Sequence, residues 1–113
     1  MQLPSDYPFS PPKICFDTPI YHANVSDSGD ICLDILKERW SPALSVPKAL
    51  EAIRILITKP DPDNALRQWI AELTRAHMQF GDADTRYVDE ARAQTRKHAS
   101  RTMAEWKAEW GAV

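Results

Sequence analysis

A chain of 113 residues, 43% of them hydrophobic, is expected to form one small domain. Its net charge of −2 gives no reason to expect nucleic acid as a partner, and no apolar run is long enough to predict a membrane span. The first residues lack the basic start and apolar stretch of a secretory signal, and two cysteines fit a reduced, cytoplasmic or nuclear setting.

The first third of the chain is predicted to be extended or irregular. The prolines of residues 4–12 exclude a helix there and favour loop-like backbone. Residues 13–16 (Lys-Ile-Cys-Phe) predict a short strand that ends at residues 17–19. Residues 20–36 are expected to be mostly irregular, with a turn at 26–30. Ordered loops of this length are usually functional.

A helix is predicted after this loop region. Ser45 can cap its first turn, Pro47 suits the start of a helix, and Pro60 lies beyond its end. Apolar residues at helical spacing define the face that we expect to be buried, namely Leu50, Ile53, Leu56 and Ile57.

Two further helices are expected, the second over residues 65–80 and the last from about residue 85 towards residue 110, with a break at 81–84. The residues expected to face inward on the second helix are Leu66, Trp69, Ile70 and Leu73. Extended chain followed by helices predicts an α+β fold.

One motif has clear chemical potential. Residues 21–24 (Tyr-His-Ala-Asn) precede residues 29–36 (Gly-Asp-Ile-Cys-Leu-Asp-Ile-Leu), so Cys32 lies just behind a turn with His22 and Asn24 upstream. A thiol can carry an acyl group as a thioester, and an amide can hold the oxyanion that forms when the thioester is attacked. Taken alone, Cys32 could equally be a buried apolar side chain. For Cys15, in the predicted strand, burial is expected.

These residues resemble the catalytic half of a ubiquitin-conjugating enzyme, as do residues 7–9 (Tyr-Pro-Phe), 11–12 (Pro-Pro) and 40–43 (Trp-Ser-Pro-Ala). The resemblance runs from Leu3 to about Ala71 and resumes less clearly near Tyr87. It implies a single partial core domain over residues 1–113, with a small antiparallel sheet remnant followed by helices. Residues 100–113 would be a helical carboxy-terminal extension. The family's first helix and first two strands have no counterpart, so an amino-terminally truncated fold is implied.

The resemblance also implies a reaction. An activating enzyme, which uses ATP, would transfer ubiquitin or a ubiquitin-like protein to the Cys32 sulfur. The thioester would then pass to a substrate lysine, usually with the help of a RING-type ligase. No cofactor, metal, nucleic acid or membrane is implied for this chain.

Further site residues follow from the same comparison. Asn24 would stabilise the oxyanion or order the loop, Asn64 would position the incoming lysine, and Asp34 would support the site. His22 and Trp40 would be structural, with Trp40 a buried anchor behind the cysteine loop. Ala23 replaces the proline usual in this motif, which removes pre-organisation of the loop.

Two surfaces are implied for protein partners. The ligase would contact loops that contain Phe9, Lys37, Ser41, Pro42 and Ala43. Glu51 and Ile55 lie on one outward face of the first predicted helix, where the family holds ubiquitin in its reactive closed form.

Two alternatives remain open. The chain could be a non-catalytic module that binds ligases or ubiquitin, because the missing first helix is a main docking surface for the activating enzyme in the family. A thiol hydrolase is poorly supported, since no motif places a histidine base beside the thiol.

The carboxy-terminal residues carry a helical stripe of Ala99, Met103, Trp106 and Trp110. This stripe is expected to pack on its own domain, to cover apolar surface left bare by the missing elements, or to dimerise.

Overall fold

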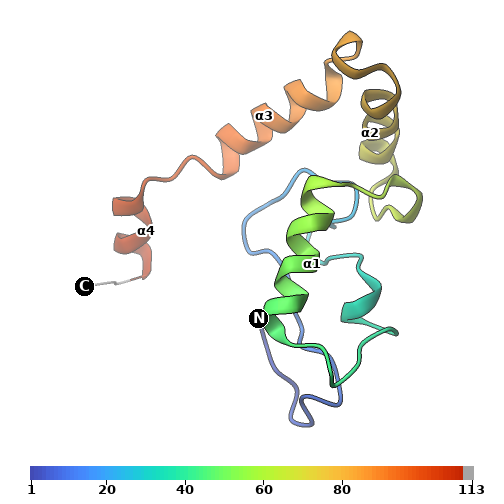
Figure 1. The fold of residues 1–113 in the computed structure, drawn as a ribbon. Helices are drawn as coiled ribbons and strands as arrows, with labels where there is room; N and C mark the ends of the chain where they lie inside the picture. The colour runs from blue at the N-terminus through green and yellow to red at the C-terminus, as the bar shows by residue number, and fades with distance from the viewer. Residues whose placement is uncertain (111–113) are drawn as a thin grey trace.

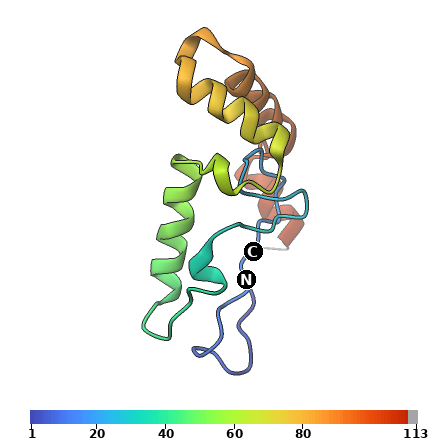
Figure 2. The same cartoon turned by 90° about the vertical axis from the view of Figure 1, so that its right-hand side faces the viewer.

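The computed structural model describes residues 1–110, without the side chains of Trp106, Lys107 and Trp110. The helices of this part are α1 (Val46–Thr58), α2 (Gln68–Phe80), α3 (Arg86–His98) and α4 (Met103–Trp110). Short 3₁₀ turns lie at η1 (Asp34–Leu36), η2 (Pro62–Asn64) and η3 (Gly81–Ala83). Irregular amino-terminal segments lie along one side of α1, and α2 lies beyond the carboxyl end of α1, not alongside it (Figure 1 and Figure 2).

The predicted strand and sheet remnant are not formed in the described residues. Antiparallel pairing is limited to three isolated bridges, Gln2 with Lys13, Cys15 with Asp30 and Val25 with Ile31. The expected strand at residues 13–16 is therefore wrong in extent, because its two bridges pair with different segments and neither continues into a ladder. The described residues therefore form a helical fold whose loops are joined by isolated β-bridges, in place of the α+β fold expected from the sequence.

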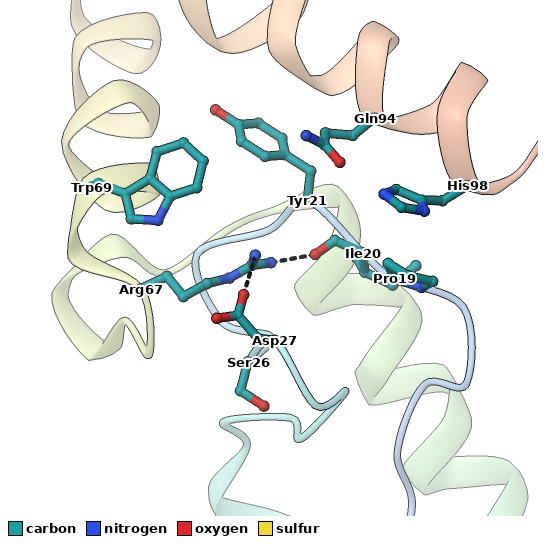
Figure 3. A pocket seen from close by; sticks show the side chains of 9 residues that line it. All are labelled: Pro19, Ile20, Tyr21, Ser26, Asp27, Arg67, Trp69, Gln94 and His98. Atoms are coloured by element: carbon teal, nitrogen blue, oxygen red, sulfur yellow. Dashed lines mark hydrogen bonds and ion pairs between the residues drawn. The ribbon is translucent and has the colours of Figure 1, made fainter.

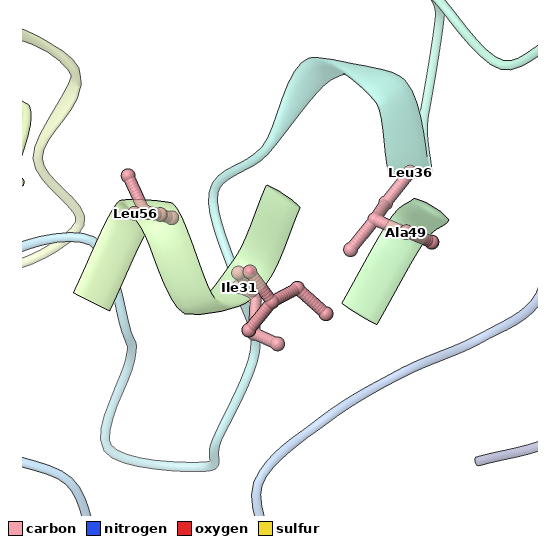
Figure 4. Close-up of a cluster of buried hydrophobic side chains, with 5 residues drawn as sticks. Ile31, Leu36, Ala49 and Leu56 are labelled. Carbon is pink, nitrogen blue, oxygen red and sulfur yellow. The ribbon is translucent and has the colours of Figure 1, made fainter. Parts of the chain in front are cut away.

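Helix α1 begins as its sequence predicts. The Ser45 hydroxyl accepts from the Lys48 backbone N–H at 3.4 Å, and Pro47 lies in the first turn, where its missing N–H costs no helical bond. Its inner face packs on the segment around the cysteine, and the buried residues of this cluster are Ile31, Leu36, Ala49, Ile53 and Leu56 (Figure 4). Leu50, expected to be buried, is 49% exposed, because it lies at the edge of the face formed by the buried residues Ala49, Ile53 and Leu56.

Helix α2 begins three residues later than predicted, at Gln68. The backbone N–H groups of Leu66 and Arg67 both donate to the Ala23 carbonyl, at 2.8 and 3.3 Å, and these long-range bonds hold the chain extended before the helix starts. Ile70 is fully buried as expected. Leu66 and Trp69 are exposed, contrary to the prediction, and Leu73 is half-buried.

The last predicted helix is two helices. α3 ends at His98, and α4 starts after Thr102, whose hydroxyl accepts from the Glu105 N–H at 3.2 Å. The Glu105 carboxylate accepts in return from the Thr102 N–H at 3.3 Å, which completes a capping box. None of the helices in residues 1–110 is long and apolar enough to cross a membrane.

The structure gives a partial view of the carboxy-terminal stripe. Ala99 and Met103 are exposed. The side chains of Trp106 and Trp110 lie outside the described residues, as do residues 111–113 of the predicted extension, so the packing of the stripe stays a prediction.

Candidate functional site

A tight main-chain turn places Cys32 directly opposite Asn24. The Cys32 N–H donates to the Asn24 carbonyl at 2.9 Å, Val25 and Ile31 form a bridge, and the Ser26 N–H donates to the Asp30 carbonyl at 2.9 Å. The sulfur-bearing residue is therefore positioned by backbone bonds on both sides of the turn.

Gly29 makes this turn possible. Its φ of +91° is unfavourable for residues with a side chain, and an added Cβ would lie 2.0 Å from the Phe16 carbonyl oxygen. The close approach also lets the Phe16 N–H donate to the Gly29 carbonyl at 2.9 Å.

The two cysteines differ in exposure, and neither forms a disulfide. Cys32 is half-buried, next to the core residue Ile31. Cys15 is exposed, so its expected burial is wrong. The sequence predicts a strand at residue 15, but the Cys15 backbone pairs with Asp30 in an isolated bridge and forms no ladder that would cover the side chain.

The Asn24 side chain is completely buried and bonds the loop before α2. Its amide donates to the carbonyls of Asp61 at 2.7 Å and Asn64 at 3.1 Å, and its oxygen accepts from the Asp61 N–H at 2.9 Å. Both amide hydrogens are used in this way. Of the two roles considered for Asn24, this geometry favours ordering of the loop over donation to an oxyanion.

The His22 ring is buried and bonds backbone at both nitrogens. Nδ1 accepts from the Asn24 N–H at 3.1 Å, so the proton lies on Nε2, which donates to the Leu56 carbonyl at 3.1 Å. Burial lowers the pKa of His22 below 6.5, although the carbonyls of Leu56 and Ile57 oppose this shift. A neutral ring engaged at both nitrogens ties the motif to α1 and has no free lone pair for a proton.

Asn64 is the last residue of η2 in the same loop and is exposed. Its backbone carbonyl accepts from the Asn24 amide, and its own side chain donates to the Asp61 carboxylate at 2.7 Å. Asp63 pairs with Arg75 at 3.2 Å. The structure thus brings Asn24 and Asn64 together, while the Asn64 side-chain oxygen stays open to an incoming donor.

Asp34 and Trp40 follow the cysteine. Asp34 starts η1, is exposed, and lies 3.6 Å from the Arg39 guanidinium. Trp40 is half-buried, and it contacts the first loop through a 2.9 Å bond from Nε1 to the Pro8 carbonyl and a ring contact with Tyr7.

The Trp40 bond joins the two loops proposed to meet a ligase. Phe9, next to Pro8, is 76% exposed, and Pro42 and Ala43 are exposed on the other loop. The half-buried Ser41 hydroxyl accepts from the Ala43 N–H at 3.2 Å and shapes that loop. Lys37 is also exposed.

Glu51 and Ile55 are both exposed on the outward face of α1. Glu51 pairs with Arg54, and the hydrogen bond from that guanidinium holds the pKa of Glu51 below its ordinary value. The Glu51 carboxylate is thus paired within α1, and Ile55 is the exposed apolar side chain of the two.

Arg67 belongs to the same region but was missed in the sequence. Its side chain is only 16% exposed, and it donates to backbone carbonyls of the segment that carries His22 and Asn24 (Figure 3). No sequence pattern near the start of α2 predicts these contacts of Arg67, because its partners lie 40 or more residues away.

A cavity of about 260 Å³ lies beside Arg67, with Tyr21, Trp69, Gln94 and His98 in its wall (Figure 3). The Tyr21 ring also contacts Tyr87, and burial with the nearby Glu90 carboxylate raises the pKa of Tyr21 to about 12. The phenol is therefore neutral at physiological pH and serves to pack α2 and α3 against residue 21. Within residues 1–110, no three His, Cys, Asp or Glu side chains form a group suited to a metal ion.

Comparisons with known proteins agree on one family. The family model described as "Ubiquitin-conjugating enzyme" matches residues 1–107. The curated protein "Probable ubiquitin-conjugating enzyme E2 31" of Arabidopsis thaliana is 44% identical over 100 residues, which cover 88% of this chain and 61% of the relative. The chain thus spans only part of the length of this relative.

Proposed function

The chain belongs to the ubiquitin-conjugating enzyme family, and we propose on that basis that Cys32 accepts ubiquitin, or a ubiquitin-like protein, as a thioester and passes it to a substrate lysine. The observation that carries this proposal is the turn that sets a half-buried thiol opposite Asn24 by a main-chain bond. Cys15, exposed and outside the motif, is not the acceptor.

Two acyl transfers make up the reaction. In the first, the Cys32 thiolate attacks the thioester carbonyl held by the activating enzyme, a new S–C bond forms, and the enzyme's thiolate leaves. In the second, a neutral lysine amine attacks the Cys32 thioester, an N–C bond forms, and the Cys32 thiolate leaves. The proton lost by the amine goes to solvent or to the departing sulfur.

The residues around the thiol would position reactants more than they move protons. Asn24 orders the loop of residues 61–64, which carries Asn64 towards the acceptor lysine. The open amide oxygen of Asn64 can accept a hydrogen bond from that amine but cannot take its proton. Asp34 would act as a nearby charge, paired with Arg39.

The partners are proposed from the exposed surfaces. Phe9, Pro42 and Ala43, on loops joined through Trp40, would form the apolar centre of a contact with a RING-type ligase, and Lys37 would add a charge. Ile55 would contact the bound ubiquitin from the outer face of α1.

The test is incubation with activating enzyme, ubiquitin and ATP, followed by a non-reducing gel. A thiol-sensitive adduct is expected with the unaltered chain and with Cys15→Ser, and it should be absent in Cys32→Ala. An adduct that survives in Cys32→Ala, or none with the unaltered chain, contradicts the proposal.

A non-catalytic binding module is the second candidate, favoured by the strong exposure of Phe9 at 76% on a loop with no catalytic group. It predicts ligase binding that is lost in Phe9→Ala although no adduct forms on Cys32. Equal binding by Phe9→Ala and the unaltered chain would rule out this use of the loop.

A further inference from the structure

We propose that Arg67 is a positioning residue for the transfer reaction, acting through the main chain of residues 20–25. This inference rests on the proposed thioester chemistry at Cys32, and it assigns the geometry of the cysteine turn to a side chain outside the recognised motif.

Arg67 binds this segment as a fork. Its Nε donates to the Val25 carbonyl at 2.8 Å, and its Nη2 donates to the carbonyls of Ile20 and, at 3.4 Å, of His22. The remaining Nη1 donates to the Asp27 carboxylate at 3.0 Å, on the far side of the turn (Figure 3). A planar guanidinium can serve several acceptors at once because its donors point in fixed directions.

The carbonyls held by Arg67 flank the one that holds the cysteine. The His22 and Val25 carbonyls accept from Arg67, whereas the Asn24 carbonyl between them accepts from the Cys32 N–H. Residues 22–25 therefore make two sets of hydrogen bonds, one with Arg67 and one with Cys32. Movement of the guanidinium would displace the Asn24 carbonyl and, with it, Cys32.

The backbone reinforces this connection. The Leu66 and Arg67 N–H groups donate to the Ala23 carbonyl, so backbone and side chain of the same residue hold the same segment. These bonds supply external order to Ala23, a residue whose φ is not fixed by a ring.

The Asp27 ion pair is the weak part of the arrangement. The Asp27 side chain is 90% exposed, whereas that of Arg67 is 16% exposed, so solvent screens the pair while the carbonyl bonds are shielded. This contrast provides a matched control. Asp27→Ala removes the ion pair alone, and Arg67→Lys keeps a positive charge but loses the fork.

The experiment measures aminolysis directly. In a Cys15→Ser background, Cys32 is loaded by exchange with the mercaptoethanesulfonate thioester of ubiquitin, and discharge is followed over a range of free lysine concentrations. Arg67→Lys is expected to lower the limiting rate by about tenfold, because small displacements of a reacting group cost rate, and to leave the lysine concentration at half-maximal rate unchanged. Asp27→Ala should remain within about twofold of the parent protein, as expected for a screened surface pair.

The outcomes separate two failures. If the parent discharges no faster than the mercaptoethanesulfonate thioester itself, the proposed function is wrong. If the parent is faster but a folded Arg67→Lys equals it, or if only the half-maximal lysine concentration changes, the role of Arg67 is wrong.

A second measurement needs no variant and applies even where Arg67→Lys does not fold. In NMR spectra of the parent, the Arg67 Nε–H is expected to exchange slowly with solvent both before and after Cys32 is loaded. Exchange at the rate of a free guanidinium in the loaded protein would overturn the proposal.

Discussion

The side chain of Asn24 and the backbone of Asp61 form a reciprocal pair of hydrogen bonds, one donated to the Asp61 carbonyl at 2.7 Å and one accepted from its N–H at 2.9 Å. This pair joins the residue opposite Cys32 to a loop 37 residues further along the chain. Any role of Asn24 in the reaction is therefore inseparable from its role in holding that loop.

Asn24→Ala is expected to lower the free energy of unfolding by about 2–4 kcal/mol, since it removes three part-buried hydrogen bonds to the main chain of Asp61 and Asn64. Urea denaturation followed by circular dichroism measures the loss. Asn64→Ala removes one exposed bond to Asp61 and should cost well under half as much. Equal losses of stability for the two variants would contradict the larger contribution expected from the hydrogen bonds between Asn24 and Asp61.

Gly29→Ala is expected to destabilise the protein more than Gly81→Ala does. Both glycines have positive φ, and such backbone strain costs a residue with a side chain about 1–3 kcal/mol. Only at Gly29 would the new Cβ also overlap a backbone oxygen, that of Phe16, whereas the space around Gly81 is open. Thermal unfolding of the two variants tests the difference, and an equal or smaller loss at Gly29 would contradict the close approach.

The buried His22 ring predicts a loss of stability in mild acid. Its pKa is lowered in the folded state, so the unfolded chain binds the proton more readily, and stability falls as the pH drops below about 6.5 towards the folded pKa. The slope from this one group is at most about 1.4 kcal/mol per pH unit. Urea midpoints are measured between about pH 7.5 and 5, an interval that brackets the ordinary histidine pKa of about 6.5. Over this interval the midpoint should fall less steeply in His22→Gln than in the unaltered protein. Parallel curves for the two proteins would mean that His22 is not the group responsible.

Asn64→Asp is expected to speed discharge of the Cys32 thioester to free lysine. A carboxylate near the amine can take up the lysine proton and stabilises the positive charge that develops on the attacking nitrogen, and an assist of one pKa unit corresponds to about 1.4 kcal/mol, or tenfold. Single-turnover discharge measures the rate. Asp63→Asn is the control, because Asp63 is already paired with Arg75 and should change the rate little. A slower or unchanged rate in Asn64→Asp would remove Asn64 from the acceptor site.

Local signals in the sequence predicted α1 well and later boundaries less well. Ser45 and Pro47 act within one turn of the helix, so the start of α1 follows from neighbouring residues. The start of α2 depends on the Ala23 carbonyl, which no window of the sequence around residues 65–68 contains. The break before α4 was not predicted, although Thr102 and Glu105 have the spacing of a capping box that forms in the structure.

The family resemblance drawn from the motifs is confirmed by the match over residues 1–107. The same motifs did not reveal the exposure of Cys15, which depends on how much sheet covers it, or the contacts of Arg67, which depend on carbonyls distant in the chain. Pattern and spacing identified the chemical groups, whereas the contacts that hold them are tertiary. The roles of the individual site residues stay predictions for the experiments above.

The bond between Cys32 and Asn24 uses backbone atoms only, so it makes no demand on the side chains at the tip of the turn. Asp27 and Ser28 are exposed there. Substitutions at these two positions can accumulate between related proteins while the thiol keeps its place, and this tip is where natural variants of the motif should differ most freely. A library randomised at residues 27 and 28 should therefore retain many members that form the thiol-sensitive adduct proposed for Cys32, in contrast to one randomised at residue 29.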